Sequence, residues 1–323
     1  MEPKTATFFD LVRDQIPEVE ARMRSGPGGH HPSLEAAIDH LLSSGGKRIR
    51  PTLVLLAGGM LSADLSNSTT LAAAIEMLHT ATLVHDDLID QSAMRRGIPT
   101  INARLTPGAT VLTGDYIFAL AANLAARTGS LPVMESFADT LMTIVNGEIT
   151  QLFGGNMSYS PDDYYERIYA KTASLFELAT RGAGLLADAD DGVLADLERF
   201  GYCIGVAFQI VDDVLDFVGK QDQVGKPVAN DLRQGIITLP TLLYMEDDGA
   251  GERVRELLHH GDMQDGAFAD LVSAIRASGA IEASMEQARR FVEDGIGLLE
   301  GMPESAERTA LRDLAAYVVQ RRI

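Results

Sequence analysis

The sequence contains no tryptophan, a single cysteine and few basic residues, and each shortage excludes a class of protein. With Cys203 as its only cysteine, the chain can form no internal disulfide and no cysteine-rich zinc site. It has 27 Lys and Arg against 46 Asp and Glu, a net charge of −19, which argues against a surface for nucleic acid or anionic membranes. An anionic substrate would therefore need metal ions or local groups of basic residues.

From the sequence we expect neither a membrane-spanning segment nor a signal sequence. Charges run through the first twenty residues, and we expect no apolar run to reach the length of a bilayer span, so the sequence predicts a cytoplasmic protein without stable membrane insertion. Aromatic residues make up only 6% of the chain, whereas Ala, Leu and Gly are plentiful. This composition predicts an all-α protein, and the absence of a linker predicts one domain, residues 1–323.

Residues 71–97, LAAAIEMLHTATLVHDDLIDQSAMRRG, combine three aspartates and a histidine that could bind a ligand, and we predict that they form one long helix. Residues four apart share a helix face, so Asp86 and Asp90 project together, with Asp87 beside them and His79 two turns earlier. The neighbouring residues are apolar, and unpaired carboxylates in apolar surroundings are costly. The group therefore predicts a bound cation.

The same spacing occurs a second time, at Asp212, Asp213 and Asp216 in FQIVDDVLDF. An all-oxygen ligand set suits Mg²⁺, which keeps several waters and shares its remaining positions with substrate phosphates. One DDxxD would occur by chance roughly 0.2 times in a chain of this composition, whereas two copies in apolar frames indicate function. Small residues, Gly201 and Gly205, precede Asp212 on its helix face and predict open space there.

A basic segment, GGKRIRP at 45–51, stands out in this acidic chain. Its glycines allow the backbone to approach a ligand closely, and Lys47, Arg48 and Arg50 concentrate positive charge, so the segment predicts a phosphate site. A solvated basic turn is the alternative. Further cations, Arg95 and Arg96, follow the first aspartate motif.

Five motifs in order, GGKRIRP, HDDLIDxxxxRRG, KTASLF, FQIVDDVLD and GKPxxxDL, resemble the trans-isoprenyl (polyprenyl) diphosphate synthase family, most of all its medium- and long-chain members. The resemblance covers roughly residues 30–245. It implies a large helical bundle around a central cavity and a homodimer, with the two aspartate-rich helix ends facing each other across the cavity mouth. One departure is Ile236, where many members have lysine.

The resemblance also assigns roles to residues. It implies about three Mg²⁺ ions per active site, with Mn²⁺ as a possible substitute, held by Asp86, Asp87, Asp90, Asp212 and Asp216. An allylic diphosphate would be held in addition by Arg95, Lys171 and Lys226. Isopentenyl diphosphate would be bound by Gly46, Lys47, Arg50, His79 and Arg96. Thr172 and Gln209 would lie close to the developing allylic cation, and the catalytic set would be Asp86, Asp87, Asp90, Lys171, Thr172, Gln209 and Asp212.

The implied function is a prenyltransferase that joins isopentenyl diphosphate to an allylic diphosphate, head to tail and in trans. Ionising the allylic C–O bond requires the leaving charge to be neutralised, and metals and fixed cations do this best in a site without water. A class I terpene cyclase is an alternative, but its second motif is usually of an Asn/Ser/Glu type. A non-catalytic subunit should have lost one aspartate motif.

Product length is predicted from the helix before Asp86. A chain anchored there should run back along one stripe: Thr82, Ala81, Leu78, Ile75, Ala74 and Leu71. In the family, an aromatic residue four or five positions before the first aspartate stops growth early, whereas this chain has Thr82 and Ala81. We therefore expect a product longer than farnesyl, with geranylgeranyl as the alternative if Leu78 or a side chain of the helix expected at 110–127 forms a floor. A further alternative is that Ala81 only packs against another helix.

Overall fold

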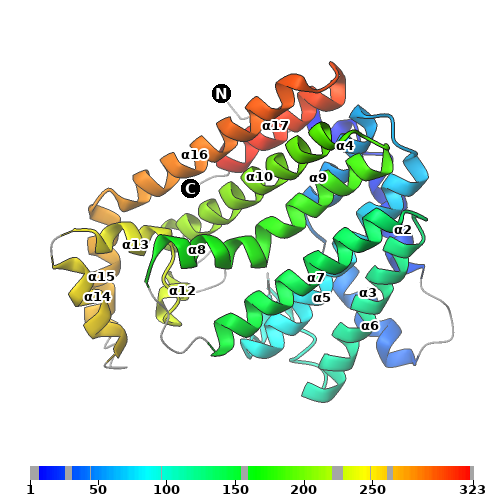
Figure 1. Cartoon of the computed structure of the whole chain (residues 1–323). Helices are drawn as coiled ribbons and strands as arrows, with labels where there is room; N and C mark the ends of the chain where they lie inside the picture. Colours follow the sequence, from blue (N-terminus) through cyan, green and yellow to red (C-terminus); the bar gives the residue numbers. More distant parts are fainter. Residues whose placement is uncertain are drawn as a thin grey trace. The chain divides into compact units, whose positions relative to one another are not determined.

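The computed structural model describes residues 7–25, 31–43, 45–95, 97–153, 159–219, 228–247, 249–259 and 265–320. Helices make up nearly all of this part of the chain, as Figure 1 shows, and its strands are a single short hairpin, β1 (Met94–Arg95) with β2 (Ile98–Pro99). The all-α prediction is confirmed.

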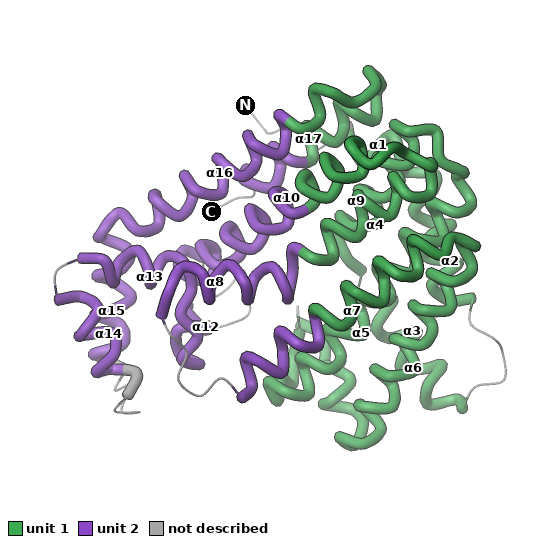
Figure 2. The backbone as a smooth tube through the Cα atoms, in the orientation of Figure 1, with its two compact units in different colours: residues 1–143, 174–201, 298–314 green, residues 144–173, 202–297, 315–323 purple. Residues whose placement is uncertain are grey.

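The chain divides into two compact units, coloured separately in Figure 2. Unit 1 comprises residues 1–143, 174–201 and 298–314, and unit 2 comprises residues 144–173, 202–297 and 315–323. Four helices contribute residues to both: α7 (Leu131–Phe153), α10 (Asp191–Val218), α16 (Ala280–Leu298) and α17 (Ala306–Gln320). A single domain around a central cavity stays a prediction.

Unit 1 is organised around α5 (Leu65–Ile89). The helix contacts α2 (Ile16–Arg24), α4 (Ile49–Met60), α6 (Pro107–Ala126) and α9 (Ser174–Leu186). Every residue from Ser68 to Leu78 is buried, as expected of a helix that is apolar on most sides. The remaining elements of this unit, besides the hairpin, are α1 (Thr7–Asp10), α3 (Pro32–Ser43) and the 3₁₀ turn η2 (Leu299–Gly301).

The ends of α5 differ from the predicted ones. It begins earlier, because the Asp64 side chain accepts a hydrogen bond from Asn67 N and caps the first turn. It ends at Ile89 rather than at 97, because Gln91 is left-handed, with φ of 51°, and the hairpin follows. The N-terminal segment is divided into two helices, because Pro17 lacks the N–H of a helix interior and α2 starts anew beside it.

The helix α6 is long and apolar enough to cross a membrane by length and composition alone. The expectation that no segment reaches that length is therefore wrong, because Asp115 is the only charged residue in this helix. One face of α6 packs on α5, as the core helix of a globular unit does. Its other face leaves Val111 and Leu112 exposed.

Unit 2 contains α8 (Pro161–Ile168), the π-helical turn η1 (Tyr169–Ala173), α12 (Asn230–Arg233), α13 (Leu239–Met245), α14 (Ala250–His259) and α15 (Asp265–Ala277). Ser160 caps α8, since its Oγ accepts a hydrogen bond from Asp163 N. Unit 2 also holds the C-terminal part of α10, which carries the second aspartate motif.

Candidate active site

The first aspartate motif lies at the C-terminal end of α5. Asp90 is the C-cap residue, and its N–H donates to the carbonyl oxygen of Asp86 at 2.8 Å. The four-residue spacing therefore stays helical, with Asp86 half-buried and Asp90 exposed. Asp87 lies about 100° round the helix and is only 6% exposed. The motif thus offers two accessible carboxylates and one that turns inward.

Arg95 holds the inward carboxylate. The hairpin returns this residue toward α5, where its Nε donates to Asp87 Oδ1 at 2.9 Å and to Oδ2 at 3.1 Å. Its Nη2 also lies 2.9 Å from Oδ1. The structure therefore places Arg95 beside the motif, as the sequence predicts, with Asp87 as its partner. Arg96 lies outside the described residues.

His85 fixes the same end of α5 against α6. Its Nε2 lies 3.3 Å from the Val111 carbonyl oxygen and 3.5 Å from Asp115 Oδ1. A side chain at Gly114 would collide with the imidazole ring. Sequence reasoning missed this residue, because its partners lie more than twenty positions further along the chain.

The three cations of the basic segment have different surroundings. Arg48 is left-handed, with φ of 47°, and its guanidinium contacts Glu20 Oε1 at 2.9 Å and Glu76 Oε1 at 2.8 Å. Arg50 is buried with its guanidinium 4.8 Å from the centre of the Phe176 ring. Lys47 is exposed. Arg48 thus ties α2, α4 and α5 together, and Lys47 and Arg50 remain the candidates for phosphate binding.

Behind the first motif, the stripe predicted to guide the product is buried. Ala81, Leu78, Ile75, Ala74 and Leu71 are all 0% exposed. At the far end, Leu71 packs against Gly182 of α9, where an added Cβ would lie 2.9 Å from the Leu71 side chain. These five side chains are thus covered by protein atoms, whereas Thr82, the member of the stripe next to the motif, is half-buried. A product path along the stripe stays a prediction.

In the second motif, too, two aspartates are partly accessible and one turns inward. Asp212 and Asp216 are half-buried on one face of α10, whereas Asp213 is 3% exposed. Asp213 Oδ2 accepts a hydrogen bond from the Tyr164 hydroxyl at 2.8 Å, and Oδ1 accepts one from Gln209 Nε2 at 2.8 Å. Burial raises the pKa of Asp213 to about 7, while the Gln209 hydrogen bond acts in the opposite direction.

Asp216 is joined to the segment that follows α10. The Asp231 N–H donates to Asp216 Oδ2 at 3.1 Å, and the Ala229 N–H donates to the Asp216 carbonyl oxygen at 2.9 Å. The segment after α10 therefore includes the short helix α12. Lys226 lies outside the described residues, and the N–H of Ile236 donates to the Asp231 carbonyl oxygen at 2.9 Å.

The π-helical turn η1 carries Lys171 and Thr172. Such turns are rare and often lie at functional sites. Lys171 Nζ is 3.1 Å from Glu148 Oε1, and Thr172 Oγ1 donates to Gln209 Oε1 at 2.7 Å. The turn packs against α7, because a Cβ at Gly147 would lie 2.5 Å from the Ala170 methyl group. Thr172 and Gln209, which the sequence predicts to act together, are thus in direct contact.

The prediction of open space at Gly201 is wrong. A Cβ there would lie 2.6 Å from both Glu177 Cα and the Phe176 carbonyl oxygen. The glycine allows the backbones of α9 and α10 to approach closely. Its role is therefore in packing rather than in leaving room for a substrate.

Within the described ranges, no three His, Cys, Asp or Glu side chains group closely enough to form a metal site by themselves. Each motif instead presents a pair of partly accessible carboxylates, Asp86 with Asp90 and Asp212 with Asp216. Paired oxygen ligands that leave positions for water and phosphate are the usual protein contribution to a Mg²⁺ site. The residues present therefore fit the predicted metal.

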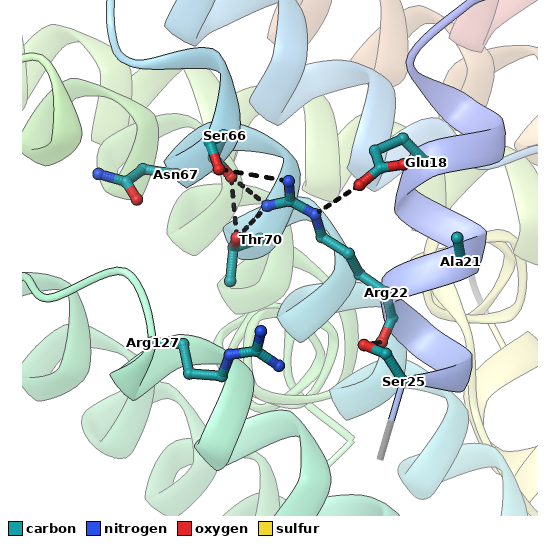
Figure 3. A pocket seen from close by; sticks show the side chains of 8 residues that line it. All are labelled: Glu18, Ala21, Arg22, Ser25, Ser66, Asn67, Thr70 and Arg127. Atoms are coloured by element: carbon teal, nitrogen blue, oxygen red, sulfur yellow. Dashed lines mark hydrogen bonds and ion pairs between the residues drawn. The ribbon is translucent and has the colours of Figure 1, made fainter. Parts of the chain in front are cut away.

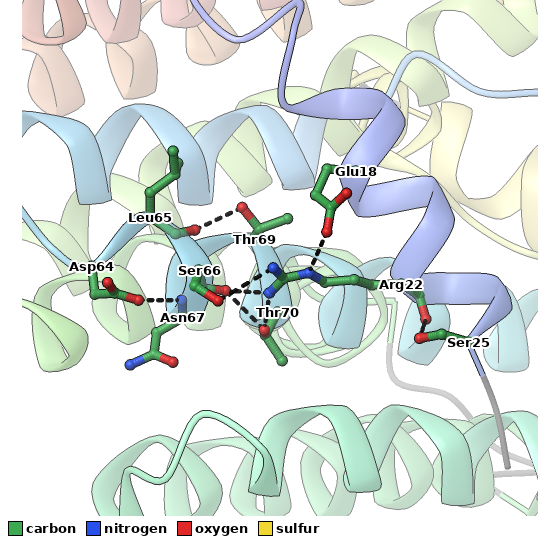
Figure 4. A network of polar contacts seen from close by, with 9 residues as sticks. All are labelled: Glu18, Arg22, Ser25, Asp64, Leu65, Ser66, Asn67, Thr69 and Thr70. Carbon is green, nitrogen blue, oxygen red and sulfur yellow. Dashed lines mark hydrogen bonds and ion pairs between the residues drawn. The ribbon is translucent and has the colours of Figure 1, made fainter.

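A separate polar pocket of about 400 Å³ lies at the other end of α5 (Figure 3). Arg22 of α2 crosses it and contacts Glu18, Ser66 and Thr70, a network drawn in Figure 4. Ser66 precedes Asp86 by twenty residues, or about 30 Å of helix. The pocket is therefore remote from the first motif, and its lining joins α2 to the first turns of α5.

Comparison with known proteins identifies the family. Residues 31–275 match the model of the family described as polyprenyl synthetase. The chain belongs to the polyprenyl synthetase family. It is 36% identical to the heptaprenyl diphosphate synthase component 2 of Geobacillus stearothermophilus over 98% of this chain and 99% of that one.

Two further members of the polyprenyl synthetase family show the same likeness. The octaprenyl diphosphate synthase of Escherichia coli is 37% identical over 87% of this chain and 88% of that one. A polyprenyl synthase of Caulobacter crescentus, solved with calcium and isoprenyl diphosphate, superposes with a TM-score of 0.91 at 31% identity, covering 99% of this chain and 100% of that one. The fold and family expected from the motifs are therefore confirmed.

Proposed function

We propose that this chain is a trans-polyprenyl diphosphate synthase, which condenses isopentenyl diphosphate with an allylic diphosphate to a product longer than farnesyl. Relatives named heptaprenyl and octaprenyl diphosphate synthase match most of its length. The observation that carries the proposal is that both aspartate motifs lie at helix ends, each with an accessible carboxylate pair. Both motifs are therefore required for the reaction.

The metal is proposed to be Mg²⁺, held by Asp86 and Asp90 in the first motif and by Asp212 and Asp216 in the second. When bound, it would neutralise the charge that develops on the leaving diphosphate. The two inward aspartates have other partners, since Arg95 holds Asp87 and both Tyr164 and Gln209 hold Asp213. They support the motifs from within the protein.

The chain's own cations bind and orient the substrates. Lys47, Arg50 and His79 of unit 1 are proposed to bind isopentenyl diphosphate, with Arg50 held in place by the Phe176 ring. Lys171 of η1 is proposed to contact the allylic diphosphate. Holding two anions in a reactive arrangement supplies much of the rate enhancement, because it removes the entropic cost of their encounter.

A second copy of this chain is the proposed partner. On α6 the outward side chains Val111 and Leu112 are 41% and 70% exposed, in a protein whose net charge is −19. An apolar helix face of this kind is a frequent subunit interface. The name of one relative, component 2, raises the alternative of a second gene product. Light scattering and an activity assay on the protein alone separate the two.

The test of the function is direct. Purified protein is incubated with Mg²⁺, isopentenyl diphosphate and farnesyl diphosphate, and the products are sized by chromatography after dephosphorylation. The proposal expects linear prenyl alcohols longer than farnesol. Cyclic hydrocarbons would indicate a terpene cyclase, and an inactive, folded protein that gains activity with a second subunit would indicate a heteromeric enzyme.

A further inference from the structure

Four polar side chains form a continuous hydrogen-bonded chain inside unit 2. It runs from Tyr164 on α8 through Asp213 and Gln209 on α10 to Thr172 on η1, with successive oxygen and nitrogen distances of 2.8, 2.8 and 2.7 Å. Tyr164 is 1%, Asp213 3% and Thr172 6% exposed. Water therefore has little access to these three groups, which depend on their neighbours for hydrogen bonds, while Gln209 between them is half-buried.

The chain has a fixed direction. An ionised carboxylate only accepts hydrogen bonds, so Asp213 requires Gln209 to turn its amide nitrogen toward it. Tyr164 donates to the other carboxylate oxygen and so occupies Oδ2. The amide oxygen of Gln209 then faces Thr172, whose hydroxyl hydrogen it accepts. As a result, the amide of Gln209 has one orientation.

We propose that Asp213 is a positioning residue that holds the Gln209 amide with its oxygen toward the reacting carbon, and that Tyr164 secures this arrangement. The inference rests on the proposed function and on the family resemblance, which implies that Gln209 and Thr172 lie beside the allylic cation. A preorganised carbonyl oxygen stabilises developing positive charge, whereas a reversed amide would present N–H groups of the wrong sign.

This role differs from that of the other aspartates in the motif. Asp212 and Asp216 are half-buried, whereas both oxygens of Asp213 are engaged by protein donors within a buried environment. A metal ligand must present an oxygen to the ion. The geometry therefore separates Asp213 from the accessible pair, although the DDxxD spacing alone treats the three alike.

The variant Asp213→Asn sets the two neighbours in conflict. Asparagine has one acceptor oxygen and one donor nitrogen. If the asparagine oxygen accepts the hydrogen bond from the Tyr164 hydroxyl, the asparagine nitrogen faces Gln209. The Gln209 amide must then reverse to offer its oxygen. If the asparagine oxygen instead accepts the hydrogen bond from Gln209 Nε2, the buried Tyr164 hydroxyl loses its acceptor. Adding Tyr164→Phe removes this conflict, because the asparagine oxygen can then turn to Gln209.

The experiment measures the single-turnover rate of the first condensation at pH 8 for both single variants and the double variant. We expect Asp213→Asn to slow this step by about 100-fold, with a smaller change in KM, and Tyr164→Phe/Asp213→Asn to recover at least about 10-fold of the loss. The matched control is Tyr165→Phe, which also removes one hydroxyl hydrogen bond from α8, to Gln287 at 2.6 Å, but cannot rescue Asp213→Asn.

A binding readout accompanies the kinetics. The probes are an allylic diphosphate analogue with an ammonium group at the cationic carbon and its neutral isostere, titrated by calorimetry. The preference for the ammonium analogue should fall about 10-fold in Asp213→Asn and return in the double variant. If the wild type condenses the substrates and the folded double variant is no faster than Asp213→Asn, the positioning role is wrong. A wild type that neither reacts nor binds either analogue overturns the proposed function as well.

Discussion

Replacing Ala81 by phenylalanine tests whether the stripe on α5 guides the growing product. Ala81 is fully buried and precedes Asp86 by five residues, which is about 7.5 Å along the helix. One helical turn of about 5.4 Å corresponds to roughly one isoprene unit. A ring at position 81, about one and a half turns from Asp86, would therefore stop growth early, and the main product should become shorter.

The two hypotheses about Ala81 predict different stabilities of the Ala81→Phe variant as well as different products. If the side chain borders space for the product, the ring fills that space and the free energy of unfolding changes little. If Ala81 packs against a neighbouring helix, overpacking should cost about 1–3 kcal/mol without a defined change in chain length. Denaturant unfolding and product sizing are measured on the same preparation.

Ala72→Phe is the matched control. Position 72 is nine residues before Ala81, so it points to the opposite side of α5, and it is equally buried. This variant should lose stability and keep the parental product distribution. A folded Ala81→Phe enzyme with unchanged products would refute the assignment of the stripe.

Three further variants test the packing and the assembly. Arg48→Met should lose about 3–5 kcal/mol in denaturant unfolding, because it leaves the buried Glu76 carboxylate without its ion pair, and adding Glu76→Gln should restore part of this loss. Gly201→Ala should lower the free energy of unfolding by about 1–3 kcal/mol, because the added methyl group collides with α9. Gly297→Ala is its control and should be neutral or stabilising, because a Cβ there meets nothing within 4 Å. Equal effects of the two variants would contradict the packing role of Gly201. Leu112→Asp should convert a dimer to monomers in light scattering, and an undisturbed dimer would exclude α6 from the interface.

Side chains close in sequence explain several helix starts. Ser160 caps α8, and Thr106 caps α6, which has Pro107 in its first turn. The end of α5 was harder to predict, because the hairpin after Gln91 and not a helix-breaking residue decides it.

The roles within each motif depend on partners far away in the chain. The inward turn of Asp213 requires Tyr164, 49 residues earlier, and the structural role of Arg48 requires Glu20 and Glu76, each 28 residues away. Residue types and spacing contain no information on such pairs. For this reason, the sequence could predict which residues form the candidate site but not which of them hold other side chains in place.

The central claim is that both aspartate motifs take part in metal-dependent binding of an allylic diphosphate. Its most direct test is calorimetric titration of farnesyl thiolodiphosphate, an unreactive analogue, into wild type, Asp86→Ala and Asp212→Ala, each with Mg²⁺ and with a chelator. We expect tight binding only by the wild type with Mg²⁺, and weakened binding by both variants while their circular dichroism stays helical. Equal affinity in the chelator, or wild-type affinity in either variant, would contradict the account.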